Sequence, residues 1–314
     1  MHLAVYLPLV IPVLAAIAAR PLADRMPPAI GTWLLVASSL ALAVASSAVL
    51  GLLALTALVR VPLVDAFANV SVQAISRNDP ASVPVAVVAG ALLAAAAAAA
   101  CRALWRRGAA ILAAGRQARR LPGSGQVVVT EDDAADAYTL PGWPCRIVIT
   151  SGMLRALTHP ERRVLLAHER AHARGAHYLF TSAARLAAAA NPLLRPVATS
   201  VGYTVERWAD EHAASVTGDR PLAARAIAHA ALASSAAPPA RTSPIAALAL
   251  IPRDLRGAGP VPRRVAALLS PPPRPSLLLL CAAVALVAVS GLSALEAARN
   301  LHQLIEYAQV ASRS

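Results

Sequence analysis

Lysine is missing from this chain of 314 residues, and all 29 of its basic residues are arginine. Charged side chains make up only 14% of the sequence, whereas hydrophobic ones make up 57%. Because soluble domains contain about a quarter charged residues, this deficit argues against an ordinary soluble protein. The composition instead indicates a protein that lies in a lipid bilayer.

Aromatic residues and cysteines are also scarce. The net charge of +13 would be compatible with a nucleic-acid partner, but aromatics are only 4% and none interleave with a basic cluster. We therefore attribute the arginines to the positive-inside bias of membrane proteins and expect no nucleic-acid partner. The three cysteines, Cys101, Cys145 and Cys281, lack the spacing of a metal site and are expected to be small apolar side chains.

Four segments are long and apolar enough to span a hydrocarbon core, which needs about 20 helical residues. They cover about residues 3–19, 30–59, 83–104 and 276–295, and they leave a short tail over 296–314. The sequence therefore predicts a multi-pass protein of the cell membrane that is mainly α-helical. The one large polar region, 105–275, lies between the third and the fourth span.

The arginines near the ends of these spans predict the orientation. The loop over 60–82 carries only Arg60 and Arg77, which Asp65 and Asp79 balance. The region between the third and fourth spans should therefore be cytoplasmic, with both termini outside. The arginines that flank this region are Arg102, Arg106, Arg107, Arg116, Arg119, Arg120, Arg263, Arg264 and Arg274.

The polar region is predicted to hold a domain over 105–237 and a proline-rich connector over 238–275. Residues 108–120 have the pattern of a basic amphipathic helix on the membrane surface. Strands are expected over 126–130 and 146–150, with an edge strand between them that ends before Pro141 and Gly142. From Thr158 onward the domain should be mostly helical, and a short basic helix is expected over 263–269.

The strongest local signal is the segment His168-Glu169-Arg170-Ala171-His172. Thr158 and Glu161 can form a capping box, Pro160 suits a first helical turn, and Gly175 can end the helix. The segment should therefore lie on one helix. The two histidines are then one turn apart and project from the same face.

Two neutral imidazoles at this spacing can hold one Zn²⁺ at about 2.0–2.1 Å. Glu169 is poorly placed to ligate the same ion, but it can reach the attacking water as a general base. A chance match in a chain of this composition is expected only about 0.005 times, so an ordinary polar surface helix is the weaker interpretation. We predict a catalytic site with one zinc ion per chain.

A catalytic zinc needs a third protein ligand. Glu206 and Asp210 are four residues apart and share a face of the helix expected over 203–216. Glu206 can therefore bind the metal while Asp210 holds the second nitrogen of one ligand histidine. The other candidates for the third ligand are His177, Glu211, His212 and His229, and those for an oxyanion-stabilising group are Arg220, Arg225 and His229.

The apolar segment over 178–199 cannot cross the membrane once, because Glu206 would then lie on the opposite side from His168. The break at Asn191 and Pro192 instead predicts a helical hairpin, either packed on the domain or dipping into the bilayer.

Residues 138–142, 147–152, the histidine-bearing helix and residues 206–210, in this order, resemble the gluzincin-type membrane proteases. The chain looks most like the BlaR/MecR-type signal-transducer metallopeptidases and more distantly like HtpX and the CAAX prenyl proteases, over roughly residues 80–295. The resemblance implies a zincin-like α+β metalloprotease domain with Glu169 as base and Asp210 as supporting acid. It implies His168, His172 and Glu206 as metal ligands and Ala137, Tyr138, Thr139 and Leu140 as the strand that binds the substrate backbone.

The expected activity is hydrolysis of peptide bonds in protein or peptide substrates by a membrane-embedded zinc metalloendopeptidase. The BlaR/MecR resemblance implies a transcriptional repressor as substrate, although residues 296–314 are too few for the penicillin-binding sensor of those proteins. The HtpX resemblance implies quality control of membrane proteins. The rival from another class is a non-proteolytic signalling protein with a structural zinc, which would need a fourth protein ligand.

Overall fold

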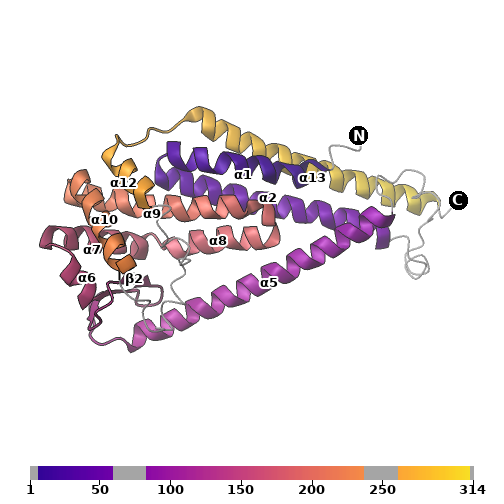
Figure 1. Ribbon diagram of the computed structural model, residues 1–314. Coiled ribbons are helices and arrows are strands. Elements are labelled where there is room, and N and C mark those ends of the chain that lie inside the picture. Colours follow the sequence, from indigo (N-terminus) through magenta and orange to yellow (C-terminus); the bar gives the residue numbers. More distant parts are fainter. Residues whose placement is uncertain (1–5, 59–82, 237–260, 312–314) are drawn as a thin grey trace.

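The computed structural model describes residues 6–58, 83–236 and 261–311, and within them the chain is mostly helical. Long helices run along one axis, and a small sheet with several shorter helices gathers at one end (Figure 1). The loop over 60–82, most of the predicted connector and the first residues of the first predicted span lie outside the described residues.

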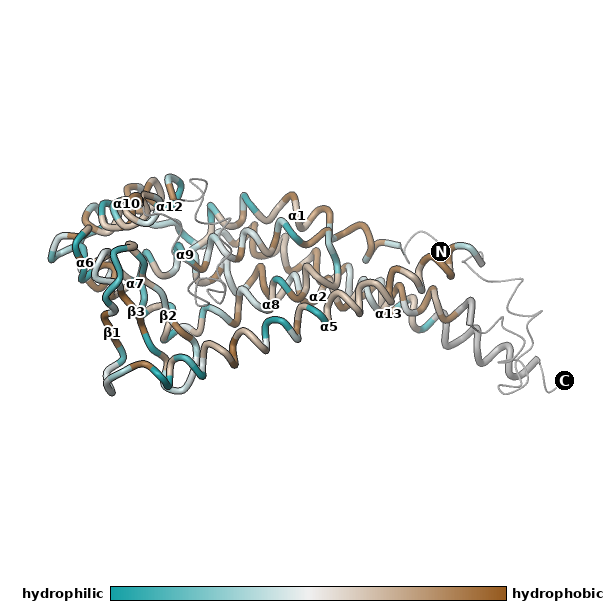
Figure 2. The backbone as a smooth tube through the Cα atoms, turned by 60° about the horizontal axis from the view of Figure 1, so that its bottom comes forward, coloured by the Kyte–Doolittle hydropathy of each residue, from teal (hydrophilic) through white to brown (hydrophobic). Residues whose placement is uncertain are grey.

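Four of the described helices are long and apolar enough to cross a membrane. They are α1 (Leu7–Arg25), α2 (Pro28–Leu58), α5 (Val83–Arg120) and α13 (Leu277–Ala311). Most residues along these helices are hydrophobic, and hydrophilic ones are concentrated toward the end that holds the sheet (Figure 2). These helices coincide with the four apolar segments of the sequence, apart from their ends.

Three of the helices extend beyond the predicted segments. α1 continues through Pro21 to Arg25, and α13 continues to Ala311. The separate surface helix expected over 108–120 is wrong, because these residues continue α5 without a break. Gly108 alone costs only about 1 kcal/mol relative to alanine, and the alanine, leucine and arginine around it favour the helix.

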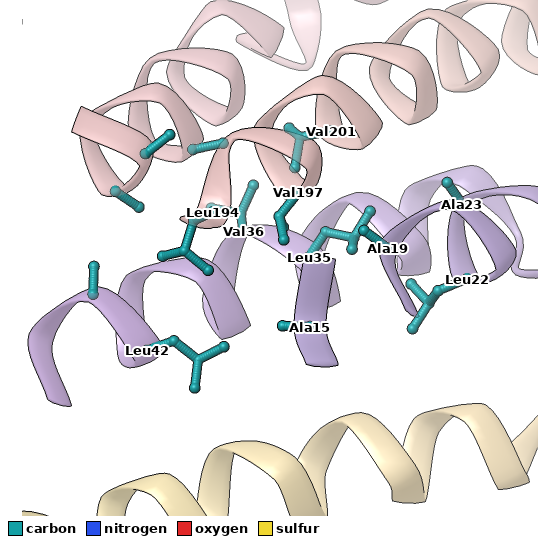
Figure 3. Close-up of a cluster of buried hydrophobic side chains, with 14 of the residues drawn as sticks. Ala15, Ala19, Leu22, Ala23, Leu35, Val36, Leu42, Leu194, Val197 and Val201 are labelled. Atoms are coloured by element: carbon teal, nitrogen blue, oxygen red, sulfur yellow. The ribbon is translucent and has the colours of Figure 1, made fainter. Parts of the chain in front are cut away.

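The hairpin predicted over 178–199 is confirmed as α8 (His177–Ala190), the short 3₁₀ helix η2 (Pro192–Leu194) and α9 (Arg195–Thr217). At the break, the Asn191 side chain accepts a hydrogen bond from the Leu193 N–H at 3.1 Å. The hairpin packs against α1, α2 and α5. Its apolar contacts with α1 and α2 are seen in Figure 3, where Leu194, Val197 and Val201 face Leu35, Val36 and Ala19.

Buried polar contacts fix the hairpin against the long helices. Asn191 Nδ2 donates to Ser46 Oγ at 3.1 Å, and Ser46 Oγ lies 2.7 Å from the Pro8 carbonyl. Nearer the sheet, Thr32 Oγ1 donates to Thr204 Oγ1 at 2.9 Å. Because Pro8 lies in the first turn of α1, the hairpin extends along almost the whole length of that helix. Such contacts between helices are worth about 0.6 kcal/mol each on average inside a membrane.

The sheet contains β1 (Val127–Thr130), β2 (Ala137–Leu140) and β3 (Arg146–Thr150), in the order β1-β3-β2. β1 is parallel to β3, and β2 is antiparallel to it. Within the described residues β2 is therefore an edge strand, as predicted. The end of α5 supports the sheet: Ala114 and Ala118 pack on Leu140 and Val148. A Cβ on Gly142 would lie 2.9 Å from the Gly115 Cα, so this close approach requires glycine.

The remaining helices of the domain are α6 (Ser151–Ala156), α7 (His159–Arg174), α10 (Arg220–Ala236) and α12 (Val261–Leu269). The predicted start and end of α7 are confirmed by the capping box of Thr158 with Glu161 and by Gly175 at the C-cap. One buried cluster joins α7, α10 and α12 to α9; it includes Val164, Ala167, Ala213, Ala223, Ile227 and Leu268.

Candidate metal centre

His168 and His172 project from α7 toward Glu206 on α9. The two Nε2 atoms are 3.1 Å apart. The Glu206 oxygens lie 3.7 Å from His168 Nε2 and 3.6 Å from His172 Nε2. The structure therefore brings together the three side chains that the sequence indicated as metal ligands.

The spacing of these donor atoms, in which the two histidines face different oxygens of Glu206, suits a zinc ion. Ligands about 2.0–2.1 Å from a tetrahedral zinc lie about 3.3 Å from one another. The observed separations of 3.1, 3.6 and 3.7 Å bracket that value. Two imidazoles with one carboxylate are also a donor set of catalytic zinc sites. The residues present therefore fit the metal that the sequence predicts.

Asp210 and Arg264 contact the side chains of this cluster. Asp210 Oδ1 lies 3.0 Å from His168 Nδ1, the nitrogen that faces away from the donor cluster. The Arg264 guanidinium contacts both carboxylates: its Nε is 2.7 Å from Asp210 Oδ2, and its Nη1 is 3.0 Å from Glu206 Oε2. Arg264 comes from α12, so this helix is tied to α9 at the site.

Glu169 follows His168 on α7 and is buried. The Thr139 hydroxyl, from the edge strand β2, lies 2.9 Å from the Glu169 carboxylate and 3.0 Å from its backbone carbonyl. Burial raises the pKa of Glu169, and the contact with Thr139 and the charge of His168 oppose that rise. A carboxylate with a raised pKa is a stronger base at neutral pH than an exposed glutamate.

The pKa values of the two histidines of the cluster shift in opposite directions when no metal is bound. Burial alone would lower the pKa of His168, but hydrogen bonds and charges from Asp210 and Glu206 raise it to about 10. Burial lowers the pKa of His172 to about 3, assisted by the charge of His168. Although burial opposes it, the Arg264 charge lowers the pKa of both Glu206 and Asp210.

A cavity of about 310 Å³ contains the cluster. The residues of β2 line one side of it, and small side chains of α10, such as Ala226 and Ala230, line another. The four residues of the predicted substrate strand all border this cavity; they are Ala137, Tyr138, Thr139 and Leu140. The edge strand and the candidate metal ligands therefore share one space.

Most of the other candidates from the sequence lie outside the cluster. Arg220 pairs with Glu211 and donates to backbone carbonyls of α12, and His229 Nδ1 lies 2.6 Å from Glu161 Oε1. Arg225 is exposed. None of these three arginine and histidine side chains borders the cavity. Among the described residues, the arginine that borders it is Arg264, which the sequence indicated only as a flanking arginine.

Two histidines on one helix, an acidic residue from a second helix and a glutamate beside them define a metallopeptidase-like centre. Residues 106–192 match the model of Peptidase family M48, and this match supports the M48 metallopeptidase family for the chain. Peptidases of this family are generally metal-dependent. The matched segment includes β2 and α7 but ends before Glu206. No curated protein and no solved structure matches the chain.

Proposed function

We propose that this protein is a membrane-embedded zinc metalloendopeptidase that hydrolyses peptide bonds in protein substrates. His168, His172 and Glu206 would hold one zinc ion per chain. The observation that carries the proposal is the convergence of these three donors, with separations of 3.1 to 3.7 Å, beside Glu169 in one cavity. The match to Peptidase family M48 over residues 106–192 supports the same class.

Zinc bound there would supply Lewis acidity toward a peptide carbonyl and a water molecule. Glu169 takes the proton from the attacking water and returns it to the leaving amine. The Thr139 hydroxyl orients the Glu169 carboxylate for this transfer, because it contacts one of its oxygens. Asp210 orients His168 through Nδ1, and Arg264 balances the charges of Asp210 and Glu206.

The edge strand β2 supports strand addition as the mode of substrate binding. One side of β2 pairs with β3, and within the described residues no strand pairs with its other side. An extended peptide that adds to residues 137–140 would lie in the cavity that contains the metal ligands. Such a backbone-directed mode favours unfolded or extended segments of protein substrates.

The arginine-rich ends of the membrane helices support a cytoplasmic catalytic domain with both termini outside. On that side, a transcriptional repressor could reach the site, as the BlaR/MecR resemblance implies. The HtpX resemblance implies membrane proteins as substrates instead. A Glu169→Ala variant should bind its substrates without cleaving them. Bound proteins that are soluble would favour the repressor, and bound proteins that span the membrane would favour quality control.

The test of the proposal is zinc content and proteolysis of the full chain in detergent, with casein cleavage and self-cleavage as readouts. We expect one bound zinc in both the wild type and Glu169→Ala, and a loss of cleavage by orders of magnitude in the variant only. A structural zinc would give bound metal without cleavage in either protein and would contradict the proposal. So would wild-type protein without zinc, or cleavage by Glu169→Ala equal to that of the wild type.

A further inference from the structure

His177 is the first residue of α8, and it is buried although it contributes no atom to the three-residue donor cluster. Its Nδ1 lies 3.0 Å from the Nδ1 of His172. The Nε2 of His172 faces the opposite way, toward His168 Nε2 at 3.1 Å. The His172 ring is therefore held between the donor cluster on one side and His177 on the other.

The two histidines of α7 are supported in the same manner by different partners. His168 presents Nε2 to the cluster and has Asp210 Oδ1 at 3.0 Å from its Nδ1. His172 presents Nε2 to the cluster and has an imidazole nitrogen at 3.0 Å from its Nδ1. A histidine that binds a metal through Nε2 carries its proton on Nδ1, and a hydrogen-bond acceptor there fixes both the tautomer and the ring orientation.

Packing holds the His177 ring in this place. The ring centroid of His177 is 4.8 Å from that of His172, with the planes at 86°, and 4.8 Å from that of Trp208. Trp208 belongs to α9, two residues beyond Glu206. The same helix that supplies the carboxylate of the cluster therefore also supports the ring of His177.

The turn between α7 and α8 adopts an unfavourable backbone conformation to bring His177 back toward α7. Ala176 has a φ of 47° in the left-handed region, which costs a residue with a Cβ roughly 1–2 kcal/mol. A Cβ on Gly175 would lie 2.5 Å from His177 Nε2, so the ring is accommodated only beside glycine. Backbone strain of this kind persists where the surrounding structure requires it, and it is common at functional sites.

We propose that His177 is a positioning residue for His172. Its Nδ1 accepts the hydrogen bond from the His172 Nδ1–H and so keeps the Nε2 lone pair of His172 directed into the donor cluster. The inference rests on the proposed function, because it requires that His172 bind the metal.

The test compares zinc affinity in full-length protein, purified in detergent and stripped of metal. His177→Phe keeps an aromatic ring beside Trp208 but has no acceptor, and His177→Asn places an oxygen near the position of Nδ1. We expect zinc binding, measured by competition with a chromophoric chelator, to weaken about 10–100-fold in His177→Phe and to recover largely in His177→Asn. The thermal unfolding temperature of the metal-free proteins should stay the same.

His159→Phe is the control, since it removes an exposed histidine from α7, the helix that carries His172, and should leave zinc affinity unchanged. Wild-type affinity in His177→Phe would overturn the inference. Equal weakening in both His177 variants, together with a lower unfolding temperature of the metal-free proteins, would also overturn it, because this result indicates packing alone. A wild-type protein that binds no zinc would instead overturn the proposed function, and this inference with it.

Discussion

At the scale of single residues, the side chain of Thr139 links the predicted substrate strand to the predicted base. Its hydroxyl contacts the Glu169 carboxylate at 2.9 Å, and its strand borders the same cavity. Burial raises the pKa of Glu169, and this contact works against the rise because it stabilises the charged form. Thr139 therefore favours the unprotonated form of the predicted base.

Thr139→Val should shift the pH dependence of proteolysis. Loss of the hydroxyl raises the pKa of Glu169 further, and only the unprotonated carboxylate accepts a proton. The acidic limb of kcat/KM against pH should therefore move upward by about one pH unit, if the hydrogen bond is worth about 1.4 kcal/mol. Thr139→Ser keeps the hydroxyl and should retain the wild-type limb. An unchanged limb in Thr139→Val would show that Thr139 does not act on the base.

At the scale of elements, Arg264 joins α12 to α9 inside the domain. Its guanidinium contacts Asp210 and Glu206, and the side chains of all three are largely buried. Removal of one partner of a buried ion pair costs about 3–5 kcal/mol, because it leaves an uncompensated charge. Arg263, the preceding residue, points elsewhere and pairs with Asp24 in a half-exposed position.

Arg264→Met should therefore lower stability strongly at neutral pH, by about 3–5 kcal/mol. The folded-state pKa values of Asp210 and Glu206 are lowered, so their contribution is present above the unfolded pKa of about 4 and is lost as pH falls below it. In thermal unfolding of metal-free protein, the difference in stability between wild type and variant should therefore shrink as the pH falls below about 4.

Arg263→Met is the matched control on the same helix, and its more exposed ion pair should contribute no more than about 1 kcal/mol. Equal losses in the two variants would contradict the role assigned to Arg264. A gap between Arg264→Met and the wild type that does not depend on pH would contradict the charge pairing.

The elements also show what the sequence could predict. The capping box of Thr158 with Glu161, the strand patterns and the spacing of His168 and His172 are local, and each produced the predicted structure. Arg264 pairs with Asp210 across 54 residues, and no periodicity connects the two. The donor cluster could therefore be predicted from the sequence, whereas Arg264 was assigned only to the charge bias. Likewise, the sequence indicated His177 only as a candidate ligand. Local patterns could not predict that its ring contacts the Nδ1 of His172.

At the scale of the whole molecule, several arginines lie at the same end of the long helices. Arg25 closes α1, Arg119 and Arg120 close α5, and Arg274 precedes α13, all toward the end that holds the sheet and the donor cluster. The contact of Arg207 Nη1 with the Ala23 carbonyl at 2.7 Å ties the end of α1 to the domain. The fold therefore brings together charges that the sequence distributes over distant segments. By the positive-inside rule, such an arginine-rich end is expected to face the cytoplasm.

This arrangement predicts opposite accessibility for two positions in cells. After replacement of Cys101, Cys145 and Cys281 by alanine, Ser71→Cys lies in the loop expected outside, and Ser124→Cys lies at an exposed position before β1. A membrane-impermeant maleimide should label Ser71→Cys in intact cells and Ser124→Cys only after lysis, because the positive-inside bias predicts that the domain is cytoplasmic. Casein cleavage by both variants would show that the label reports on folded protein. Labelling of Ser124→Cys in intact cells, with Ser71→Cys protected, would invert the topology and place the substrates outside the cytoplasm.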